Sequence, residues 1–255
     1  MRFCRFKHQG AVLYGAIHGD QVVALTAAPW ESAAERSLAV PLASAELCPP
    51  AESSKIVAVG QNYRKHAEEL GKPVPPEPLI FIKPATALNA HLQPIRLPPE
   101  SAEVHHEAEL ALVIGQRLKD ADEAQAARAI FGLTCFNDVT ARDIQRREVQ
   151  HTRAKGYDTF ACAGPWMETE LSPADLCVVC RVNGQVRQDG RTSDMIFPPA
   201  RLVSFISRIM TLLPGDLVST GTPAGVGPLR DGDRVEVEIE GIGALVNPVT
   251  LARTT

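Results

Sequence analysis

The sequence has no apolar run that approaches the roughly 20 residues of a membrane-spanning helix. Its first ten residues, MRFCRFKHQG, lack the apolar core of a secretory signal peptide. Basic charge is not in excess either, since 26 Lys and Arg stand against 30 Asp and Glu and the net charge is -4. We therefore expect no membrane and no nucleic acid as partner, because nucleic-acid binding usually shows as a basic surface.

Several catalytic signatures are also missing. There is no GxSxG nucleophile elbow, no P-loop, no GxGxxG that opens a helix, and no HExxH. The six cysteines lie in apolar stretches and not at the spacings of a disulfide framework, which favours a reducing cytoplasm. Cys177 and Cys180 would point to opposite faces of a strand, so a zinc site is not favoured there. What remains is an ordinary composition, 45% hydrophobic and 22% charged, in a chain of 255 residues that can bury a full core.

Short apolar runs separated by turn residues dominate the chain. Two such runs flank residues 18–20 and predict a β-hairpin, whereas residues 41–54, rich in Ala, Ser and Pro, predict a linker. We therefore predict a small N-terminal β unit at residues 1–50 and a catalytic domain at residues 51–255. The later patterns predict strands at residues 55–59, 79–82, 104–114, 133–136 and 234–249, a hairpin around Asn183-Gly184, helices at 62–70, 121–131 and 202–213, and a helix opened by a capping box at 140–143. The predicted class is α+β and strand-rich, without the regular strand–helix alternation of a parallel α/β fold.

The segment at 104–114 is the most informative. In a strand, residues two apart share a face, so Glu107 and Glu109 point the same way while the opposite face is apolar. Two like charges at this spacing repel, and burial raises the cost. A divalent cation would resolve both problems. An exposed acidic edge strand, or glutamates paired with arginine, is the alternative, and the strand by itself does not decide between them.

A third acid, Asp138, stands where a predicted buried strand runs into a helix. Functional side chains are common at such junctions, although an aspartate there can equally be a plain helix cap. Ligation by carboxylate oxygens alone suits hard ions, so the three acids favour Mg²⁺ or Mn²⁺ over zinc.

The predicted helix at 62–70 has glycines at both ends and a proline-rich segment after it, which is typical of a mobile flap. His66 and Glu69 are three residues apart on it and can touch. A carboxylate beside an imidazole raises its basicity and suits a general base. The alternative is a solvated polar helix face, which the spacing alone favours.

Six strings in this order along the chain make the sequence resemble the fumarylacetoacetate hydrolase family. They are VGQNYRKH (59–66), HEAEL (106–110), NDVTARD (137–143), KGYDTF (155–160), QDGRTSDM (188–195) and GTPAGVGP (221–228). The similarity is to the short branch of acylpyruvate hydrolases, oxaloacetate decarboxylases and hydroxyheptadienedioate isomerases. It covers residues 55 to 230, and residues 1–50 resemble the family's variable N-terminal part only loosely.

The resemblance implies a mixed β-roll of the type of the family's C-terminal domain, and usually a homodimer. It implies that Glu107, Glu109 and Asp138 bind Mg²⁺ or Mn²⁺. The partner it implies is a small keto acid.

The resemblance also implies roles for residues outside the acids. His66 and Glu69 would form a dyad on a lid that closes over the substrate. Lys155 and Thr222 would reach the substrate carboxylate or the developing oxyanion.

Other polar and charged residues bear on whether the substrate carries one carboxylate or two. Arg142 and Gln145 are expected to contact it. Arg64, Lys83 and Arg142 can pair with a second carboxylate and so favour a diacid, but each can equally be a surface or structural charge.

The expected activity is metal-dependent hydrolysis of a carbon–carbon bond in a 3-acylpyruvate, such as acetylpyruvate, fumarylpyruvate or maleylpyruvate, through an enolate. His66, oriented by Glu69, would take a proton from the attacking water. Oxaloacetate decarboxylation and isomerisation of 2-hydroxyhepta-2,4-diene-1,7-dioate share that enolate and remain open. A non-catalytic keto-acid or metal binder is a further alternative, although a binder needs no base.

Overall fold

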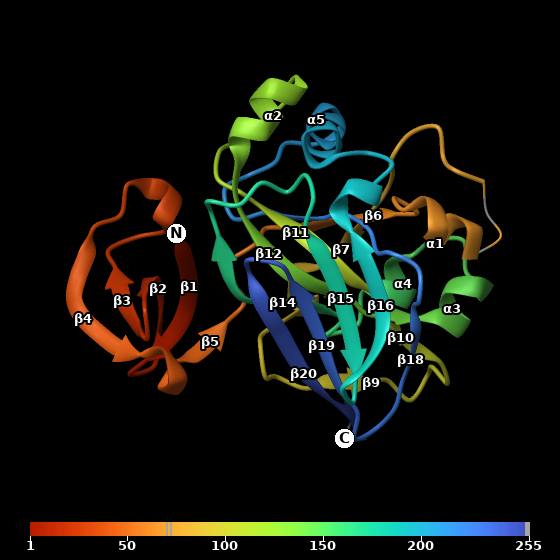
Figure 1. Ribbon diagram of the computed structural model, residues 1–255, viewed down its shortest axis with the longest axis horizontal. Helices are drawn as coiled ribbons and strands as arrows, with labels where there is room; N and C mark the ends of the chain where they lie inside the picture. Colours follow the sequence, from red (N-terminus) through yellow and green to blue (C-terminus); the bar gives the residue numbers. More distant parts are fainter. Residues whose placement is uncertain (70, 72, 253–255) are drawn as a thin grey trace.

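The computed structural model describes residues 1–69, 71 and 73–252 of the chain (Figure 1). The N-terminal part contains β1 (Arg2–His8), β2 (Ala11–His18), β3 (Gln21–Leu25), η1 (Pro29–Glu31), β4 (Glu35–Pro41), η2 (Leu42–Ser44) and β5 (Glu46–Cys48). The predicted hairpin joins β2 to β3, and Gly19 in its turn has a φ of 60°, which glycine adopts without strain. The predicted linker at 41–54 is wrong in part, because β5 pairs with β1.

The rest of the chain is also rich in strands. Its strands are β6 (Ile56–Gly60), β7 (Leu79–Lys83), β8 (Leu88–Asn89), β9 (Ile95–Leu97), β10 (Val104–His106), β11 (Ala108–Ile114), β12 (Ile130–Asp138), β13 (Thr140–Ala141), β14 (Ala161–Glu168), β15 (Cys177–Val182), β16 (Gln185–Arg191), β17 (Leu217–Ser219), β18 (Gly227–Leu229), β19 (Arg234–Ile239) and β20 (Gly243–Leu251). Its helices are α1 (Arg64–Glu69), η3 (Ala85–Ala87), α2 (Glu123–Ala129), α3 (Arg142–Arg147), α4 (Thr152–Lys155), η4 (Thr192–Asp194) and α5 (Pro199–Ile209). The predicted strand-rich α+β class is confirmed. Leu70, the last residue of the predicted first helix, lies outside the described residues.

The strands form one large sheet and two smaller ones. The large sheet has the order β4-β3-β2-β1-β14-β12-β11-β17-β6-β7, with β5 added at β1 and β8 at β14. A second sheet has the order β13-β10-β18, and a third the order β16-β15-β19-β20-β9. Two residue pairs, Arg2↔Glu168 and Phe3↔Met167, join β1 to β14, so the N-terminal strands extend the main sheet.

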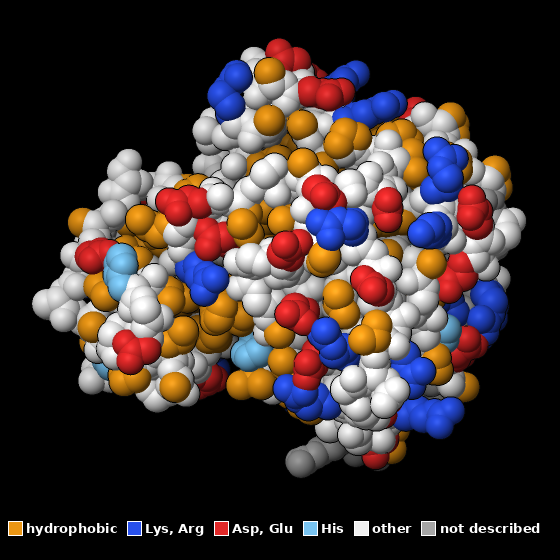
Figure 2. All heavy atoms as spheres, viewed as in Figure 1, with side chains coloured by type: hydrophobic (Ala, Val, Ile, Leu, Met, Phe, Trp, Pro, Cys, Tyr) orange, Lys and Arg blue, Asp and Glu red, His pale blue; other side chains and the backbone are white. Residues whose placement is uncertain are grey.

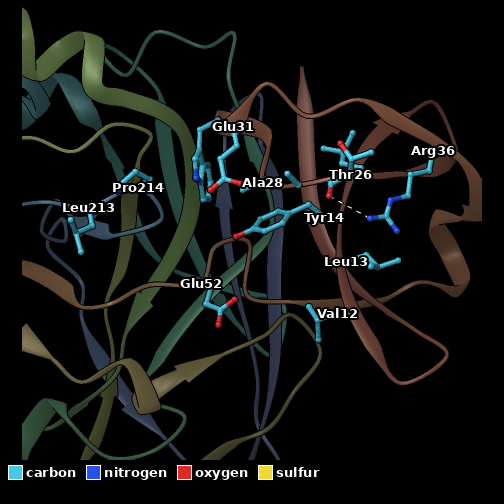
Figure 3. Close-up of a pocket in the computed structure, with 13 residues that line it drawn as sticks. Val12, Leu13, Tyr14, Thr26, Ala28, Glu31, Arg36, Glu52, Leu213 and Pro214 are labelled. Carbon is cyan, nitrogen blue, oxygen red and sulfur yellow. Dashed lines mark hydrogen bonds between the residues drawn. The ribbon is translucent and has the colours of Figure 1, made fainter.

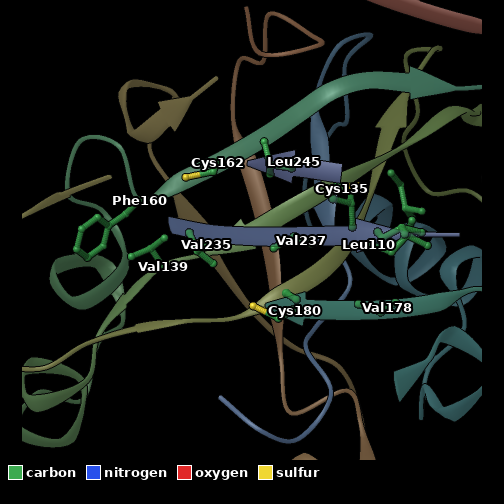
Figure 4. Packing of buried hydrophobic residues seen from close by; sticks show 14 of the residues in the cluster. Leu110, Cys135, Val139, Phe160, Cys162, Val178, Cys180, Val235, Val237 and Leu245 are labelled. Atoms are coloured by element: carbon green, nitrogen blue, oxygen red, sulfur yellow. The ribbon is translucent and has the colours of Figure 1, made fainter. Parts of the chain in front are cut away.

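The core lies between the main sheet and the third sheet (Figure 4). Leu110 and Cys135 come from the main sheet, and Val178 and Leu245 come from the third. Val237 is 1% exposed and occupies the inward face that the alternation of β19 predicts. Burying one such aliphatic side chain stabilises the fold by about 1.5–3 kcal/mol.

Aromatic side chains join the N-terminal strands to the body. The Trp30 ring packs 5.5 Å from Tyr14 on one side and 5.5 Å from Phe131 of β12 on the other. A cavity of about 590 Å³ beside them is lined from both parts, by Tyr14 and Glu52 among others and by Leu213 across the gap (Figure 3). None of the predicted site residues lines it.

The surface carries charges of both signs. On the face shown in Figure 2, acidic and basic side chains are interspersed, and no single sign dominates. None of the helices formed by the described residues has both the length and the apolar content that a membrane crossing needs.

The predicted capping box at 140–143 is wrong, although a helix does begin there. Ala141 is the N-cap of α3, and it makes no side-chain capping bond. Asp143 instead accepts hydrogen bonds from the Ser101 hydroxyl at 2.6 Å and the Ala102 amide at 3.2 Å. These bonds connect the loop between β9 and β10 to the helix. A capping box of this kind opens α2, where Asp122 and Gln125 satisfy each other's backbone amides.

A pH dependence of stability follows from His91. Its Nδ1 accepts a hydrogen bond from the Val246 amide at 3.1 Å, and burial, with Arg234 nearby, lowers its pKa. The folded chain therefore binds fewer protons at this site than the unfolded chain, whose pKa is about 6.5. The stabilisation that the neutral ring provides is complete above that pH and is lost as the pH falls through the folded pKa.

We expect His91→Gln to cost about 1 kcal/mol at pH 7.5, the typical net worth of one hydrogen bond. The difference from the parent chain should shrink as the pH falls below about 6.5, because glutamine does not titrate. Urea unfolding at each pH measures both curves. Parallel curves would contradict the assignment to His91.

Candidate active site

The strand predicted at 104–114 is interrupted at Glu107. β10 pairs with β13 and β18, whereas β11 pairs with β12 and β17, so the chain changes sheet at this residue. The Glu107 amide donates to Oδ1 of Asn137 at 2.9 Å, and its carbonyl accepts from the Asp138 amide at 2.9 Å. The prediction of one continuous strand is therefore wrong, because the neighbouring strands differ on the two sides of the break.

The three predicted acids come together despite this break. Glu107, Glu109 and Asp138 are 5%, 1% and 1% exposed, and one carboxylate oxygen from each lies within 4.8 Å of the others. Glu109 comes from β11 and Asp138 from the end of β12. Three convergent carboxylate oxygens are a donor set that fits a hard divalent cation.

The acids differ in their neighbours. The guanidinium of Arg142 donates to Oε1 of Glu107 at 2.5 Å, and the ammonium of Lys155 donates to its Oε2 at 2.8 Å. Burial opposes ionisation of Glu107, but Lys155 and Arg142 outweigh it and hold its pKa below the usual range. Burial and the nearby Asp138 and Glu107 carboxylates raise the pKa of Glu109 well above its usual value. Glu109 is thus the acid that most needs an added cation.

Lys155 lies at the centre of the cluster. Its Nζ is 2.5 Å from Oδ2 of Asp138 as well as 2.8 Å from Glu107, and it sits 5.0 Å above the Phe81 ring. Burial disfavours its charge, but Asp138 and Glu107 more than compensate and raise its pKa. The side chain is therefore a buried cationic donor next to the acids.

The predicted dyad forms on α1. His66 Nδ1 lies 3.0 Å from Oε2 of Glu69, so the carboxylate accepts the Nδ1 proton and leaves Nε2 as the basic nitrogen. The other oxygen of Glu69 accepts from the Gly225 amide at 3.0 Å, which fastens α1 to the loop before β18. Gly225 has a φ of 97°, and a Cβ there would lie 2.2 Å from the Arg187 carbonyl, so a side chain would disturb this fastening.

One cavity of about 570 Å³ collects most of the predicted residues. Those lining it are His66, Glu107, Glu109, Arg142, Gln145, Lys155 and Thr222, together with Phe81, Arg146 and His151. Glu69 and Asp138 stand behind its wall, against His66 and Lys155 respectively.

Two of the predicted substrate contacts are already engaged within the protein. Gln145 accepts a hydrogen bond from Arg142 at 2.6 Å, and the Thr222 hydroxyl donates to the Ala108 carbonyl at 2.8 Å. As placed, that hydroxyl has no second proton for a substrate oxygen. The Nε of Arg142 has no hydrogen-bond partner among the described residues.

The suggestion that Arg64 or Lys83 pairs with a second substrate carboxylate is not supported. Arg64 is exposed and borders a different hollow, beside Tyr63 and Asp194. Lys83 is completely buried and donates to Oδ1 of Asp138. Of the three cations considered for that role, Arg142 alone lines the cavity.

The sequence patterns missed several supporting residues. Gln188 accepts from the Ala108 amide at 2.9 Å and donates to the Thr222 hydroxyl at 2.7 Å, so it joins β16 to both sides of the site. Its Oε1 also lies 3.0 Å from Nδ1 of His106, whose pKa burial lowers to about 4. Ser219 donates to Glu109 from β17. Gln188 opens one of the strings quoted above, but nothing local marks it or Ser219 as part of the site.

Comparison with known proteins agrees with this geometry. The profile described as fumarylacetoacetate (FAA) hydrolase C-terminal matches residues 55–250, which include every residue of the cavity. The chain belongs to the fumarylacetoacetate hydrolase family. A second profile, Rv2993c-like N-terminal, matches residues 1–50.

Relatives within the fumarylacetoacetate hydrolase family carry several activities in their names. Protein Rv2993c of Mycobacterium tuberculosis is 54% identical over 82% of this chain and 80% of its own length. A mitochondrial oxaloacetate tautomerase of Bos taurus is 43% identical over 80% of this chain and 68% of its own length.

Solved structures of the family superpose closely. The 5-carboxymethyl-2-hydroxymuconate delta-isomerase of Mycobacterium smegmatis is 45% identical, with a TM-score of 0.93 over 99% of this chain and 100% of that one. A maleylpyruvate hydrolase of Sphingobium is 30% identical, with a TM-score of 0.82 over 99% of this chain and 100% of that one.

Proposed function

We propose that the chain is a divalent-metal-dependent isomerase or tautomerase that moves a proton on a 2-oxo dicarboxylic acid through an enolate. One observation carries the proposal: a histidine paired through Nδ1 with Glu69 and three convergent carboxylates line or border the same cavity. The first can hold a proton, and the second can hold the cation that an enolate needs. Proton transfer next to a carbonyl needs a base and a group that stabilises the enolate.

The donor set fits Mg²⁺ or Mn²⁺, held by Glu107, Glu109 and Asp138. Such an ion would supply Lewis-acid polarisation of the keto oxygen. The Lys155 ammonium adds a fixed positive charge beside the place where negative charge develops, which is worth most in a buried site.

His66 is proposed to move the proton. Glu69 fixes its tautomer through the 3.0 Å contact at Nδ1 and leaves Nε2 to take a proton from the carbon next to the carbonyl. Returning that proton to a different atom completes an isomerisation or a tautomerisation, so no water is consumed.

A second carboxylate on the substrate would meet Arg142, through the Nε that has no partner among the described residues. Arg146, four residues later on α3, also borders the cavity but is held by Glu103. This favours a diacid over a monoacid such as pyruvate.

Names among the relatives support proton transfer as the first choice, since an oxaloacetate tautomerase is 43% identical and a 5-carboxymethyl-2-hydroxymuconate delta-isomerase 45% identical. Hydrolysis of a 3-acylpyruvate is the second candidate. The same His66 would then activate water, and the similarity to a maleylpyruvate hydrolase favours it.

The test is a panel of substrates assayed with Mg²⁺, Mn²⁺ and a chelator. We expect ketonisation of enol-oxaloacetate or isomerisation of 2-hydroxyhepta-2,4-diene-1,7-dioate to depend on metal, and cleavage of acetylpyruvate and maleylpyruvate to be at least about tenfold slower. Exchange of the methyl protons of pyruvate in heavy water, followed by NMR, reports enolate formation directly. Absence of turnover and of exchange would overturn the proposal and favour a binding protein.

A further inference from the structure

Each of the three acids has one oxygen held by a donor other than Lys155. Oε1 of Glu107 receives the Arg142 guanidinium at 2.5 Å, and Oδ1 of Asp138 receives the Lys83 ammonium. Oε2 of Glu109 receives the Ser219 hydroxyl and, at 2.9 Å, the Gly221 amide. The second oxygens of Glu107 and Asp138 accept from Lys155 at 2.8 and 2.5 Å, so they are the oxygens that a bound cation would share with that ammonium.

Lys83 is the least expected of these donors. It is the last residue of the edge strand β7, and no part of its side chain is exposed. Besides Asp138, its Nζ donates to the Phe160 carbonyl at 2.7 Å and the Val139 carbonyl at 3.3 Å. An ammonium has three N–H donors, so all of them are used and none can reach a substrate.

We propose that Lys83 is a positioning residue that restricts Asp138 to a single ligand oxygen, Oδ2, and thereby keeps coordination positions of the bound ion open for a chelating keto acid. The inference rests on the proposed function. A carboxylate can bind a cation through one oxygen or both, whereas Mg²⁺ demands about six ligands in all. Three single-oxygen acids leave about three positions, and a 2-oxo acid uses two of them. A second oxygen from Asp138 would take one of the three, which removes the place for a water and crowds the two positions that the 2-oxo acid uses.

The competing role for Lys83 is purely structural, as a tie between β7, β12 and the residue before β14. A purely structural contact affects the stability of the fold and nothing else. A positioning residue also changes how many ligand places remain on the ion, which can be counted without any turnover.

The experiment uses Mn²⁺ as the probe in Lys83→Met. Electron paramagnetic resonance line broadening in oxygen-17-labelled water counts the waters on bound Mn²⁺, and titration gives the affinity of the loaded protein for pyruvate. We expect about one water fewer than in the parent chain, and pyruvate binding weaker by about tenfold or more, the usual range for a lost partner of a metal ligand.

Lys83→Gln guards against poor folding, because its amide keeps a hydrogen-bond donor in the buried site but lacks the charge that holds Asp138. We expect the same loss of water and pyruvate affinity. Lys55→Met is the matched control, because Lys55 also pairs with a buried aspartate, Asp216, away from the cavity. It should lower the unfolding temperature and leave both Mn²⁺ measurements unchanged.

Unchanged water number and pyruvate affinity in both Lys83 variants, with only a lower unfolding temperature, would overturn the inference and leave Lys83 as a structural tie. Failure of the parent chain to bind Mn²⁺ would instead refute the proposed function. The two failures are therefore distinguishable.

Discussion

Glu109→Gln is expected to remove metal-dependent turnover while leaving the metal-free fold as stable as before, or more stable. The amide oxygen can still accept from Ser219 and from the Gly221 amide, and glutamine has the size and charge of the protonated acid that burial and its acidic neighbours favour. An amide NH₂ in place of the second oxygen cannot bind a cation. Metal polarisation is worth several kcal/mol, and about 4 kcal/mol corresponds to roughly 10³-fold in kcat/KM.

Glu107→Gln is the matched comparison, because it makes the same chemical change at an acid with opposite surroundings. It removes the charge that pairs with Arg142 and Lys155, and breaking buried pairs of this kind costs about 3–5 kcal/mol. We therefore expect it to lose both activity and stability. Assays with saturating Mg²⁺ and thermal unfolding of the metal-free proteins separate the two. Equal destabilisation of both variants, or an active Glu109→Gln, would contradict the assignment.

His66→Ala is expected to lower kcat by about 10² to 10⁴, the usual contribution of a general base, with the affinity for Mn²⁺ unchanged. The imidazole is 4% exposed and lines the cavity, but it is not among the three acids. Glu69→Ala should lower kcat as well and also raise KM. Without the carboxylate, His66 is no longer held in one tautomer, and α1 loses its hydrogen bond to Gly225.

Glu68→Ala provides the control for both variants. It removes the same charge from the neighbouring, exposed position of the same helix, and it should leave kcat and KM within a factor of about two. Full activity in His66→Ala would show that another group moves the proton. A large effect in Glu68→Ala would show that the charge of the helix matters more than the dyad.

Local patterns in the sequence were sufficient to predict the strands and turns of elements that bury one face. The alternation at β19, the Asn183-Gly184 turn and the apolar face of β11 each follow from residues within ten positions of one another. The same reasoning placed Glu107 and Glu109 on one face. That conclusion survives although the strand is interrupted at Glu107, because both side chains still turn toward Asp138.

What the sequence could not supply depends on contacts between distant parts of the chain. Lys83 meets Asp138 across 55 positions, and Gln188 meets Ala108 across 80. A lysine at the end of an edge strand gives no local sign that it will be buried. Proximity of His66 and Glu69 followed from helical spacing, but their place beside the acids required the fold and the family resemblance.

The residue pairs that join β1 to β14 have a consequence for how the protein can be divided. The two regions matched by separate family profiles are continuous through one hydrogen-bonded sheet and through the Trp30 contact with Phe131. Cutting the chain near residue 50 would uncover the edge of β14 and an aromatic face together, and exposed edges of this kind recruit other chains. We therefore expect residues 51–255 alone to associate with other chains more readily than the whole chain does, and a shortened version would need another segment to cover that edge.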